Sequence, residues 1–186
     1  MARQPKSLKG FLLLDGGNLA GSIFRRSVVL ICQHDAEGAF GLILNKPTGA
    51  RLVDVLPGNM PATLKTQMLF TGGPVQPQSL SYLHSDVHLL NPNVMKGLSV
   101  GHTLDGLVEL SESNSLTQRL LTFAGYAGWE GGQLEDEMRR EAWLTHPASL
   151  DLVFSNAPET LWKRIISKKG WQYRLMAEGP EDLSSN

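Results

Sequence analysis

The sequence has only one cysteine, Cys32, among its 186 residues. A lone cysteine cannot close an intrachain disulfide bond, which excludes the class of small secreted domains held together by disulfides. Asn-x-Ser/Thr glycosylation sites are absent, and no apolar run approaches the roughly 20 residues that a membrane-spanning helix needs. The apolar run Phe11 to Leu14 is too short for the core of a signal peptide. We therefore expect a cytoplasmic protein without membrane contact.

An excess of charge of either sign is also lacking. Lys and Arg number 17 and Asp and Glu number 18, which gives a net charge of −1 at pH 7. Nucleic-acid-binding domains usually show a strongly basic face, so direct nucleic-acid binding is not favoured. The Gly-x-x-x-x-Gly-Lys phosphate loop is missing, and Asn45-Lys46-Pro47-Thr48 has Thr48 where the guanine-reading element of GTPases has Asp. We expect no cofactor and no GTP hydrolysis.

The chain is long enough for one domain with a sizeable core. Hydrophobic residues make up 41% and charged residues 19%, as in ordinary globular proteins. A domain of this size buries roughly 70% of the surface that its unfolded chain exposes. We predict a single domain over residues 1–177. Residues 178–186 are polar and contain a Gly-Pro pair, which predicts a frayed tail.

Short apolar runs bounded by Gly, Pro or Asp dominate the chain, and most of them predict strands. The predicted strands cover residues 11–14, 28–32, 39–44, 67–70, 80–84, 120–127, 142–144, 150–154 and 171–176. The predicted helices cover residues 51–56, 104–110, 133–140 and 158–167, and 116–123 is equally compatible with a helix. Because adjacent strands outnumber helices, we predict the α+β class: a single compact domain with a mixed, largely antiparallel β-sheet flanked by a few helices.

The segment from Gly125 to Glu135 is the most distinctive part of the sequence. It holds four glycines, two carboxylates and two aromatic residues, Tyr126 and Trp129. Glycine permits positive φ and close backbone approach, so the segment predicts a junction between a strand and a helix. Acids that precede bases by four residues on that helix predict the ion pairs Glu135–Arg139 and Asp136–Arg140.

Three segments rich in Gly or Pro each follow an apolar strand, and strand ends on one side of a sheet can bring such loops together. Loops carry function more often than the scaffold beneath them, and Tyr and Trp are typical anchors of interfaces. We predict a groove that binds a small molecule or a protein partner, with Lys46 at its mouth to attract an anion. A purely structural turn remains the alternative at 45–47 and 72–74. The predicted groove residues are Asn45, Lys46, Pro47, Gly72, Gly73, Pro74, Tyr126, Trp129 and Gln133.

Two sets of residues keep an enzymatic reading open. Cys32 and His34 lie two apart, so on a regular strand they project from one face, and a nearby imidazolium lowers the pKa of a thiol. Free cysteine is more often a small buried hydrophobe. Carboxylates between Glu130 and Glu137 could act as general acids or bases, although a solvated helix face explains them equally well.

A metal site is weakly indicated at one place. His84 and His88, with Asp86 between them, have a spacing that suits ligands on a helix. However, their segment predicts strand and loop, and no paired cysteines or His-Glu-x-x-His motif accompanies them. We predict no metal.

Four segments, in this order, resemble the bacterial YqgE/AlgH family. They are 25–34, which begins Arg-Arg-Ser-Val, Gly-Leu-Ile-Leu-Asn-Lys-Pro at 41–47, Phe-Thr-Gly-Gly-Pro-Val-Gln at 70–76, and 125–134, which begins Gly-Tyr-Ala-Gly-Trp. The resemblance implies a compact α+β domain of the bacterial cytoplasm, in a family with some members labelled as transcriptional regulators. It supplies no catalytic residues. Glu130, where family members often have glycine, and the segment 97–117 depart from the pattern.

We interpret the chain as a non-enzymatic binding or regulatory domain, with an indirect role in transcription regulation as one possibility. One alternative is an enzyme that uses Cys32 and His34, or the carboxylates from Glu130 to Glu137. A direct DNA-binding regulator is the other alternative, which the near-neutral charge and the lack of a clear helix-turn-helix pattern disfavour.

Overall fold

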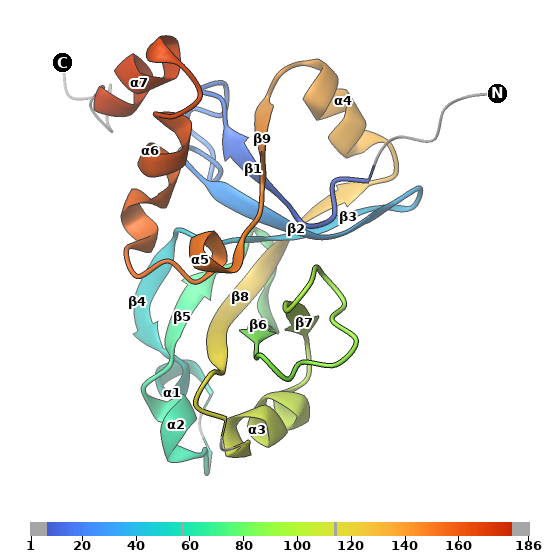
Figure 1. The fold of residues 1–186 in the computed structure, drawn as a ribbon, viewed down its shortest axis with the longest axis vertical. Coiled ribbons are helices and arrows are strands. Elements are labelled where there is room, and N and C mark those ends of the chain that lie inside the picture. Colours follow the sequence, from blue (N-terminus) through green and yellow to red (C-terminus); the bar gives the residue numbers. More distant parts are fainter. Residues whose placement is uncertain (1–6, 57, 114, 180–186) are drawn as a thin grey trace.

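The fold is built on one long, twisted β-sheet (Figure 1). The computed structural model describes residues 7–56, 58–113 and 115–179, and the sheet has nine strands within them. The strands are β1 Phe11–Asp15, β2 Val28–Asp35, β3 Gly38–Ile43, β4 Pro47–Arg51, β5 Met68–Thr71, β6 Val75–Ser85, β7 Ser99–Gly101, β8 Arg119–Glu130 and β9 Trp143–Pro147.

The long strand β8 joins the two ends of the sheet. Its first half pairs with β5 in parallel and with β6 antiparallel, whereas its second half pairs antiparallel with β3. The strand order is β4-β5-β8-β3-β2-β1-β9, with β6 beside β8 and β7 beside β6. Only the β5–β8 pair is parallel among the strand pairs of the described chain. The prediction of a mixed, largely antiparallel sheet in the α+β class is confirmed.

Short helices cover the two ends of the sheet (Figure 1). They are α1 Leu52–Val55, α2 Ala62–Lys65, α3 Leu104–Glu112, α4 Gln133–Arg139, α5 Leu150–Val153, the 3₁₀ helix η1 Pro158–Thr160, α6 Leu161–Ile166 and α7 Trp171–Glu178. Helices α1, α2 and α3 lie at the bottom of the view, α4 at the top right, and α6 and α7 along the left side. The predicted helices at 51–56, 104–110, 133–140 and 158–167 are confirmed in kind.

Alternate residues of a strand pack in different hydrophobic clusters, one on each face of the sheet. Leu12 and Leu14 of β1 pack in the cluster that also buries Trp162 of α6, whereas Leu13 between them packs with Trp143 on the opposite face. This alternation follows from the period of two along a strand. A third cluster lies under α1, α2 and α3. Because both faces of β1 and β2 are covered, these strands are continuous apolar runs, as expected for a sheet buried on both sides.

Two predicted strands are wrong. Residues 150–154 contain α5, and residues 171–176 begin α7. Short apolar runs do not distinguish a strand from a helix by periodicity alone. For α5, the local signal was the side chain of Ser149, which caps the helix by accepting a hydrogen bond from the Leu152 N–H. For α7, tertiary contact decides, since Ala177 packs into the main core.

Only the last part of the glycine-rich segment 125–135 is the predicted junction between a strand and a helix. Strand β8 continues to Glu130, and the chain turns only at Gly131 and Gly132. The predicted ion pairs also differ, because Arg139 pairs with Asp136 three residues away and Glu135 contacts His34. Pro57 and residues 180–186 lie outside the described residues, so most of the predicted tail does too, while Glu178 ends α7.

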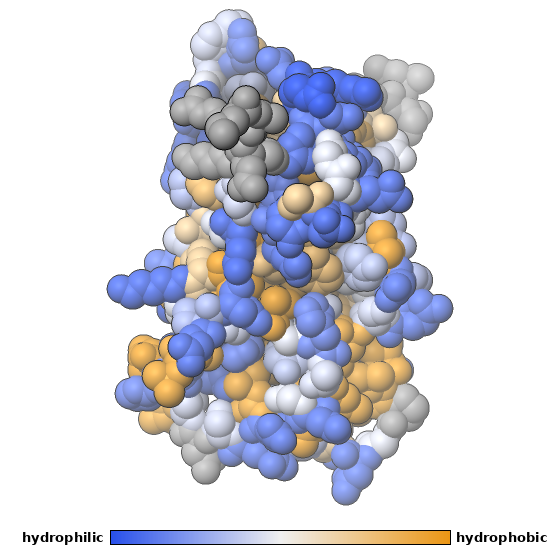
Figure 2. All heavy atoms as spheres, turned by 90° about the vertical axis from the view of Figure 1, so that its right-hand side faces the viewer, coloured by the Kyte–Doolittle hydropathy of each residue, from blue (hydrophilic) through white to orange (hydrophobic). Residues whose placement is uncertain are grey.

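One face of the molecule combines a polar upper half with apolar patches in its lower half (Figure 2). Large exposed hydrophobic side chains of the protein include Val87, Leu90, Leu104 and Leu116. Val87 and Leu90 lie in the loop between β6 and β7, Leu104 begins α3, and Leu116 lies between α3 and β8. Within the described residues, no helix is both long and apolar enough to cross a membrane.

Candidate functional site

The predicted turns at 45–47 and 72–74 lie side by side at the backbone level. The Thr71 N–H donates to the Lys46 carbonyl at 2.9 Å, and the Gly72 N–H donates to the Ala124 carbonyl of β8 at 2.9 Å. Gly72 also accepts a hydrogen bond from the Ile43 N–H. Two of the three predicted bends are therefore neighbours, and the second of them also contacts β8 beside Gly125.

The two glycines pack against β8 and do not open a groove. A Cβ atom added to Gly72 would lie 2.2 Å from the Gly125 carbonyl oxygen, and one added to Gly73 would lie 2.1 Å from the Tyr126 carbonyl carbon. Both glycines are buried, whereas Pro74 beside them is exposed. This geometry favours the structural reading of the Gly72-Gly73-Pro74 turn.

Tyr126 and Trp129 lie on opposite faces of β8 because they are an odd number of residues apart. Tyr126 contacts Phe40, with ring centroids 5.0 Å apart, on the face of the main core. Trp129 packs between Phe24 and Trp143 on the other face and is only 7% exposed. The structure therefore separates the two aromatic residues that the sequence analysis joined in one groove.

The carboxylate of Glu137 fixes this second aromatic cluster. Its Oε2 accepts hydrogen bonds from the indole N–H groups of Trp129 and Trp143, both at 2.8 Å. Its Oε1 accepts from the side-chain amide of Gln133, whose Oε1 in turn accepts the Glu130 N–H. Two buried indoles need acceptors, and Glu137 satisfies both. The arrangement gives Glu137 and Gln133 a packing role.

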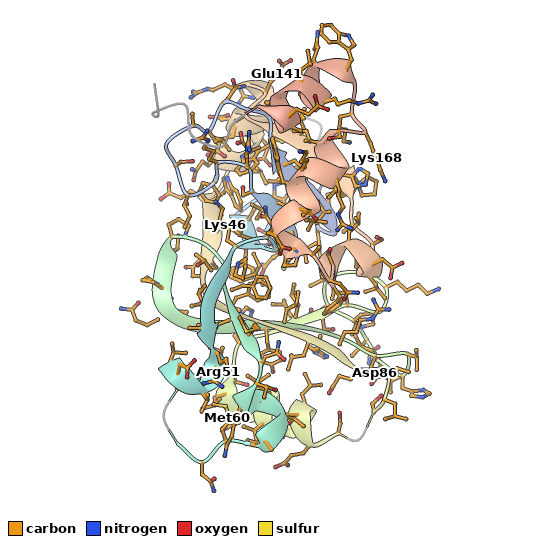
Figure 3. The ribbon with its side chains drawn as sticks, turned by 90° about the vertical axis from the view of Figure 1, so that its left-hand side faces the viewer. Lys46, Arg51, Met60, Asp86, Glu141 and Lys168 are labelled. Carbon is orange, nitrogen blue, oxygen red and sulfur yellow. The ribbon has the colours of Figure 1, made fainter. Side chains whose placement is uncertain are left out.

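Lys46 lies in the wall of a surface cavity of about 390 Å³. Figure 3 shows it at mid-height, above β4 and beside α6. The Lys46 Nζ donates to the Arg25 carbonyl at 3.1 Å. The cavity is lined by Ser22, Arg25, Arg26, Asn45, Lys46 and Glu159.

Asn45 ties the turn before β4 to the loop before β2. Its Oδ1 accepts the Val28 N–H at 2.8 Å, and its Nδ2 donates to the Arg26 carbonyl at 2.8 Å. The amide is buried, and both ends of it are used. Asn45 therefore holds the Arg25-Arg26 segment against the Lys46 turn, and the sequence motif Asn-Lys-Pro is explained in part by this contact.

Arg26 has a strained backbone at the centre of this site. Its φ is +52°, which is uncommon for a residue other than glycine. The buried carboxylate of Asp15 accepts the Arg26 N–H at 2.7 Å and also accepts the Gly17 and Leu19 N–H groups. Strain that the surroundings enforce in this way is concentrated at functional sites. Sequence reasoning missed Arg25 and Arg26 as site residues, although both lie in a family segment.

Basic side chains predominate among the described residues that line the cavity. Arg25, Arg26 and Lys46 contribute three positive charges there and Glu159 one negative charge. Arg26 also places its guanidinium over the ring of Trp162, 5.2 Å from the centroid. A concave, partly desolvated surface with this balance raises the local concentration of anions. Arginine in particular suits carboxylate and phosphate groups because of its planar fork of donors.

Cys32 and His34 do not face each other. A β-bulge between Ile31 and Gln33 interrupts the pairing of β2 with β3. Cys32 consequently packs in the main core, whereas His34 accepts the Leu8 N–H at Nδ1 and has its Nε2 2.9 Å from Glu135. Burial raises the pKa of the Cys32 thiol far above its ordinary value. The thiol is neutral and inaccessible, so the geometry does not support thiol catalysis.

We expect Cys32 to resist alkylation in the native protein. Only 2% of the residue is exposed, and the thiolate is the reactive form. Iodoacetamide at pH 8 should label the protein only after unfolding in guanidinium chloride, and mass spectrometry of intact protein measures the extent. Rapid native labelling, at a rate near that of free cysteine, would contradict the buried position.

Two serines that the sequence reasoning missed have neighbours typical of a catalytic serine. Ser99 lies in a Gly-x-Ser-x-Gly pattern at 97–101, and the Ser81 Oγ is 3.0 Å from the Nδ1 of His102. A nucleophile elbow exposes its serine at a turn between strand and helix. Here Ser81 is 2% and Ser99 7% exposed, and both lie in paired strands. Neither is positioned to meet a substrate.

The histidines at 84 and 88 do not form a metal centre with Asp86. Among the residues that the structure describes, no cluster of three or more His, Cys, Asp or Glu side chains has the geometry to hold a metal ion. Burial lowers the pKa of His84. Asp86 instead accepts the His88 N–H and the Thr117 hydroxyl in a loop.

Comparison with known proteins gives a consistent result. The family described as AlgH-like matches residues 12–174. A UPF0301 protein of Chlamydia felis is 36% identical over 180 residues, which cover 96% of this chain and 95% of the relative. A UPF0301 protein of Chlorobium chlorochromatii is 36% identical over 179 residues, covering 95% and 94% of the two chains.

Solved structures share the fold. The solution structure of the AlgH protein from Pseudomonas aeruginosa has a TM-score of 0.74 and 28% sequence identity, over 97% of this chain and 98% of that one. A crystal structure of a protein from Corynebacterium diphtheriae has a TM-score of 0.75 with 24% identity, over 94% of each chain. At that identity, the second comparison concerns the fold alone.

Proposed function

The chain belongs to the AlgH-like family, and within that family we propose that it is a non-enzymatic binding domain whose ligand is an anion held in the Arg25–Lys46 cavity. The single observation that carries the proposal is the enforced positive φ of Arg26 in the wall of a cavity that Arg25 and Lys46 also line. Asp15 and Asn45 hold that backbone from both sides. The function belongs to these loops and not to the sheet below them.

The proposed ligand is a small molecule, or an acidic segment of a protein partner, with a carboxylate or phosphate group. We further propose that binding serves a regulatory purpose in the bacterial cytoplasm and that any effect on transcription is indirect. The net charge of −1 supports this choice over direct DNA binding, which usually relies on a broad basic surface.

The enzymatic alternatives receive less support. The Cys32 thiol is buried and separated from His34, Glu137 accepts two indole hydrogen bonds, and Glu135 contacts His34. Glu130 is exposed, and its backbone N–H donates to the Gln133 side chain. A binding role requires none of these groups to react.

Anion binding is tested by titrating the ¹⁵N-labelled protein with methyl phosphate and with acetate at low salt. We expect amide shifts at residues 25–27 and 45–46. Arg25→Gln and Lys46→Met should each weaken binding by about tenfold, because a hydrogen bond to a charged group contributes roughly 1.5–3 kcal/mol. Binding should also weaken with rising ionic strength.

Lys65→Met provides the matched control. Lys65 is exposed at the end of α2, which lies at the bottom of Figure 1, and its replacement changes the net charge by the same amount as Lys46→Met. An equal loss of affinity in all three variants would mean that only net charge matters, and the proposed cavity would be rejected. Absence of any shift at residues 25–27 and 45–46 with either anion would also reject it.

A further inference from the structure

A second, smaller cavity shares Arg25 and Arg26 in its wall with the first. Its volume is about 170 Å³, and it lies between the loop after β1 and helices α6 and α7. Ala20, Trp162 and Met176 contribute apolar surface to it. An anionic group held by the two arginines therefore has an apolar recess beside it.

We propose that the anion bound by this protein carries one small flat ring, which occupies the recess between Ala20 and Trp162. This inference rests on the proposed function, because it places the charged group in the Arg25–Lys46 cavity. The ligand class is an aryl phosphate or an aryl carboxylate. The arginines hold the charged end, and the recess takes the apolar end.

The volume fits one six-membered ring. A dry protein cavity of about 150 Å³ accepts benzene, and the recess has about 170 Å³. The recess therefore has room for an apolar ring beside the arginines, which a purely electrostatic site would not need.

Asp15, Trp162 and one guanidinium nitrogen of Arg26 already bond within the protein. Asp15, which lies in the recess wall, accepts three backbone N–H groups through its carboxylate. The Trp162 indole N–H donates to the Asp15 carbonyl at 3.0 Å, and the Arg26 Nη2 donates to the Gly179 carbonyl at 2.7 Å. What the recess offers to a ligand beside the arginines is thus mainly apolar surface.

The experiment compares pairs of anions that differ only in the ring: methyl phosphate with phenyl phosphate, and acetate with benzoate. At pH 8 both phosphate monoesters are dianions, since their second pKa is about 6. We expect the ring to raise affinity about tenfold, the gain for roughly 60 Å² of apolar surface removed from water. The phosphate and carboxylate arms identify which charged group the arginines prefer.

Ala20→Leu fills the recess without changing a charge. Ala20 lies in the recess wall and is exposed on its loop, so the variant is expected to fold. It should remove the tenfold gain from the ring and leave the affinity for methyl phosphate or acetate unchanged. Ala62→Leu, at an exposed position of α2, is the control and should keep the gain.

The outcomes separate the two proposals. Equal affinity for ring and ring-free anions, both shifting residues 25–27 and 45–46, would overturn the recess and leave the anion site standing. A ring preference that Ala20→Leu does not reduce would overturn the recess too. If no anion of either pair binds at those residues, the proposed function fails and this inference fails with it.

Discussion

Gly73→Ala is expected to lower the free energy of unfolding by about 3–5 kcal/mol. Losses of this size arise from severe steric clashes or from buried polar groups without partners. A Cβ atom at this position would lie 2.1 to 2.3 Å from the Tyr126 carbonyl group and the Ala127 nitrogen. These are backbone atoms of the central strand β8, which cannot rotate away as a side chain can. The clash must displace either β8 or the turn that follows β5, and both hold the two ends of the sheet together.

Urea unfolding followed by circular dichroism measures this effect, with the midpoint and slope both fitted. Gly49→Ala is the control. Gly49 has a φ of +81° and no atom within 4 Å of an added Cβ, so only the positive φ opposes alanine, at roughly 1–2 kcal/mol. If both variants lose the same stability, the close approach of the turn to β8 does not exist in solution.

Asp15→Ala is expected to lower the free energy of unfolding by about 3–5 kcal/mol, since three donors lose a charged acceptor at once. Asp15 is 2% exposed. Its Oδ1 accepts the Gly17 and Leu19 N–H groups at 2.8 and 3.3 Å, and its Oδ2 accepts the Arg26 N–H at 2.7 Å. Alanine leaves these N–H groups without their acceptor and removes one restraint on the strained Arg26.

Asp35→Ala serves as the comparison, because Asp35 also accepts a backbone N–H in a turn but is exposed. We expect a clearly smaller loss of stability there than at Asp15, because water replaces the lost acceptor. The same urea experiment measures both variants. A loss from Asp15→Ala no larger than that from Asp35→Ala would show that the loop after β1 does not depend on the carboxylate.

The Asp15 variant also connects stability with binding. Asp15 holds the backbone of Arg26, so Asp15→Asn should weaken the binding of methyl phosphate. The affinity is measured without denaturant, on variant protein that circular dichroism shows to be folded. Asparagine keeps one acceptor oxygen, but its amide NH₂ cannot accept the second set of N–H bonds. If the variant binds methyl phosphate as tightly as the unchanged protein does, the strained backbone of Arg26 does not contribute to ligand binding.

Much of the fold was predictable from the sequence where local signals were strong. The hairpin around Asp35 to Gly38 follows from turn residues between two apolar runs, and β2 and β3 pair across it in the structure. Helix α4 was predicted from residues 133–140 and covers Gln133–Arg139. Local propensity and tertiary packing agree at these places, so a reading of adjacent residues was sufficient.

The errors arose where packing overrides local pattern. The apolar residues of 150–154 and 171–176 fit a strand as well as a helix. The Ser149 cap marks the first as a helix, and contact of Ala177 with the main core decides the second. The bulge beside Cys32 shifts the period of two along β2. Cys32 and His34 therefore lie on different faces, although their spacing predicts one face.

The candidate site shows the same division. Asn45 and Lys46 were predicted from the sequence as residues of a binding surface that attracts an anion, and that role remains a proposal. Trp129 was placed in the same groove, yet it is buried with Trp143 on the other side of β8. Arg25 and Arg26 join Lys46 through contacts between segments distant in sequence: Asn45 bonds to the backbone of Arg26, nineteen residues earlier in the chain, and Lys46 bonds to the Arg25 carbonyl.

The sequence by itself determined the class of this protein: its family, an α+β fold with a mixed sheet, and the positions of most strands and helices. These depend on composition, on motifs and on the periodicity of apolar residues, which are properties of neighbours in the chain. Only the tertiary structure decided which side chains share a surface, because β8 presents alternate residues to two different cores and the loop at Arg26 is held by residues distant in sequence. Contacts of that kind depend on the register of strands and the path of loops, which no local pattern encodes.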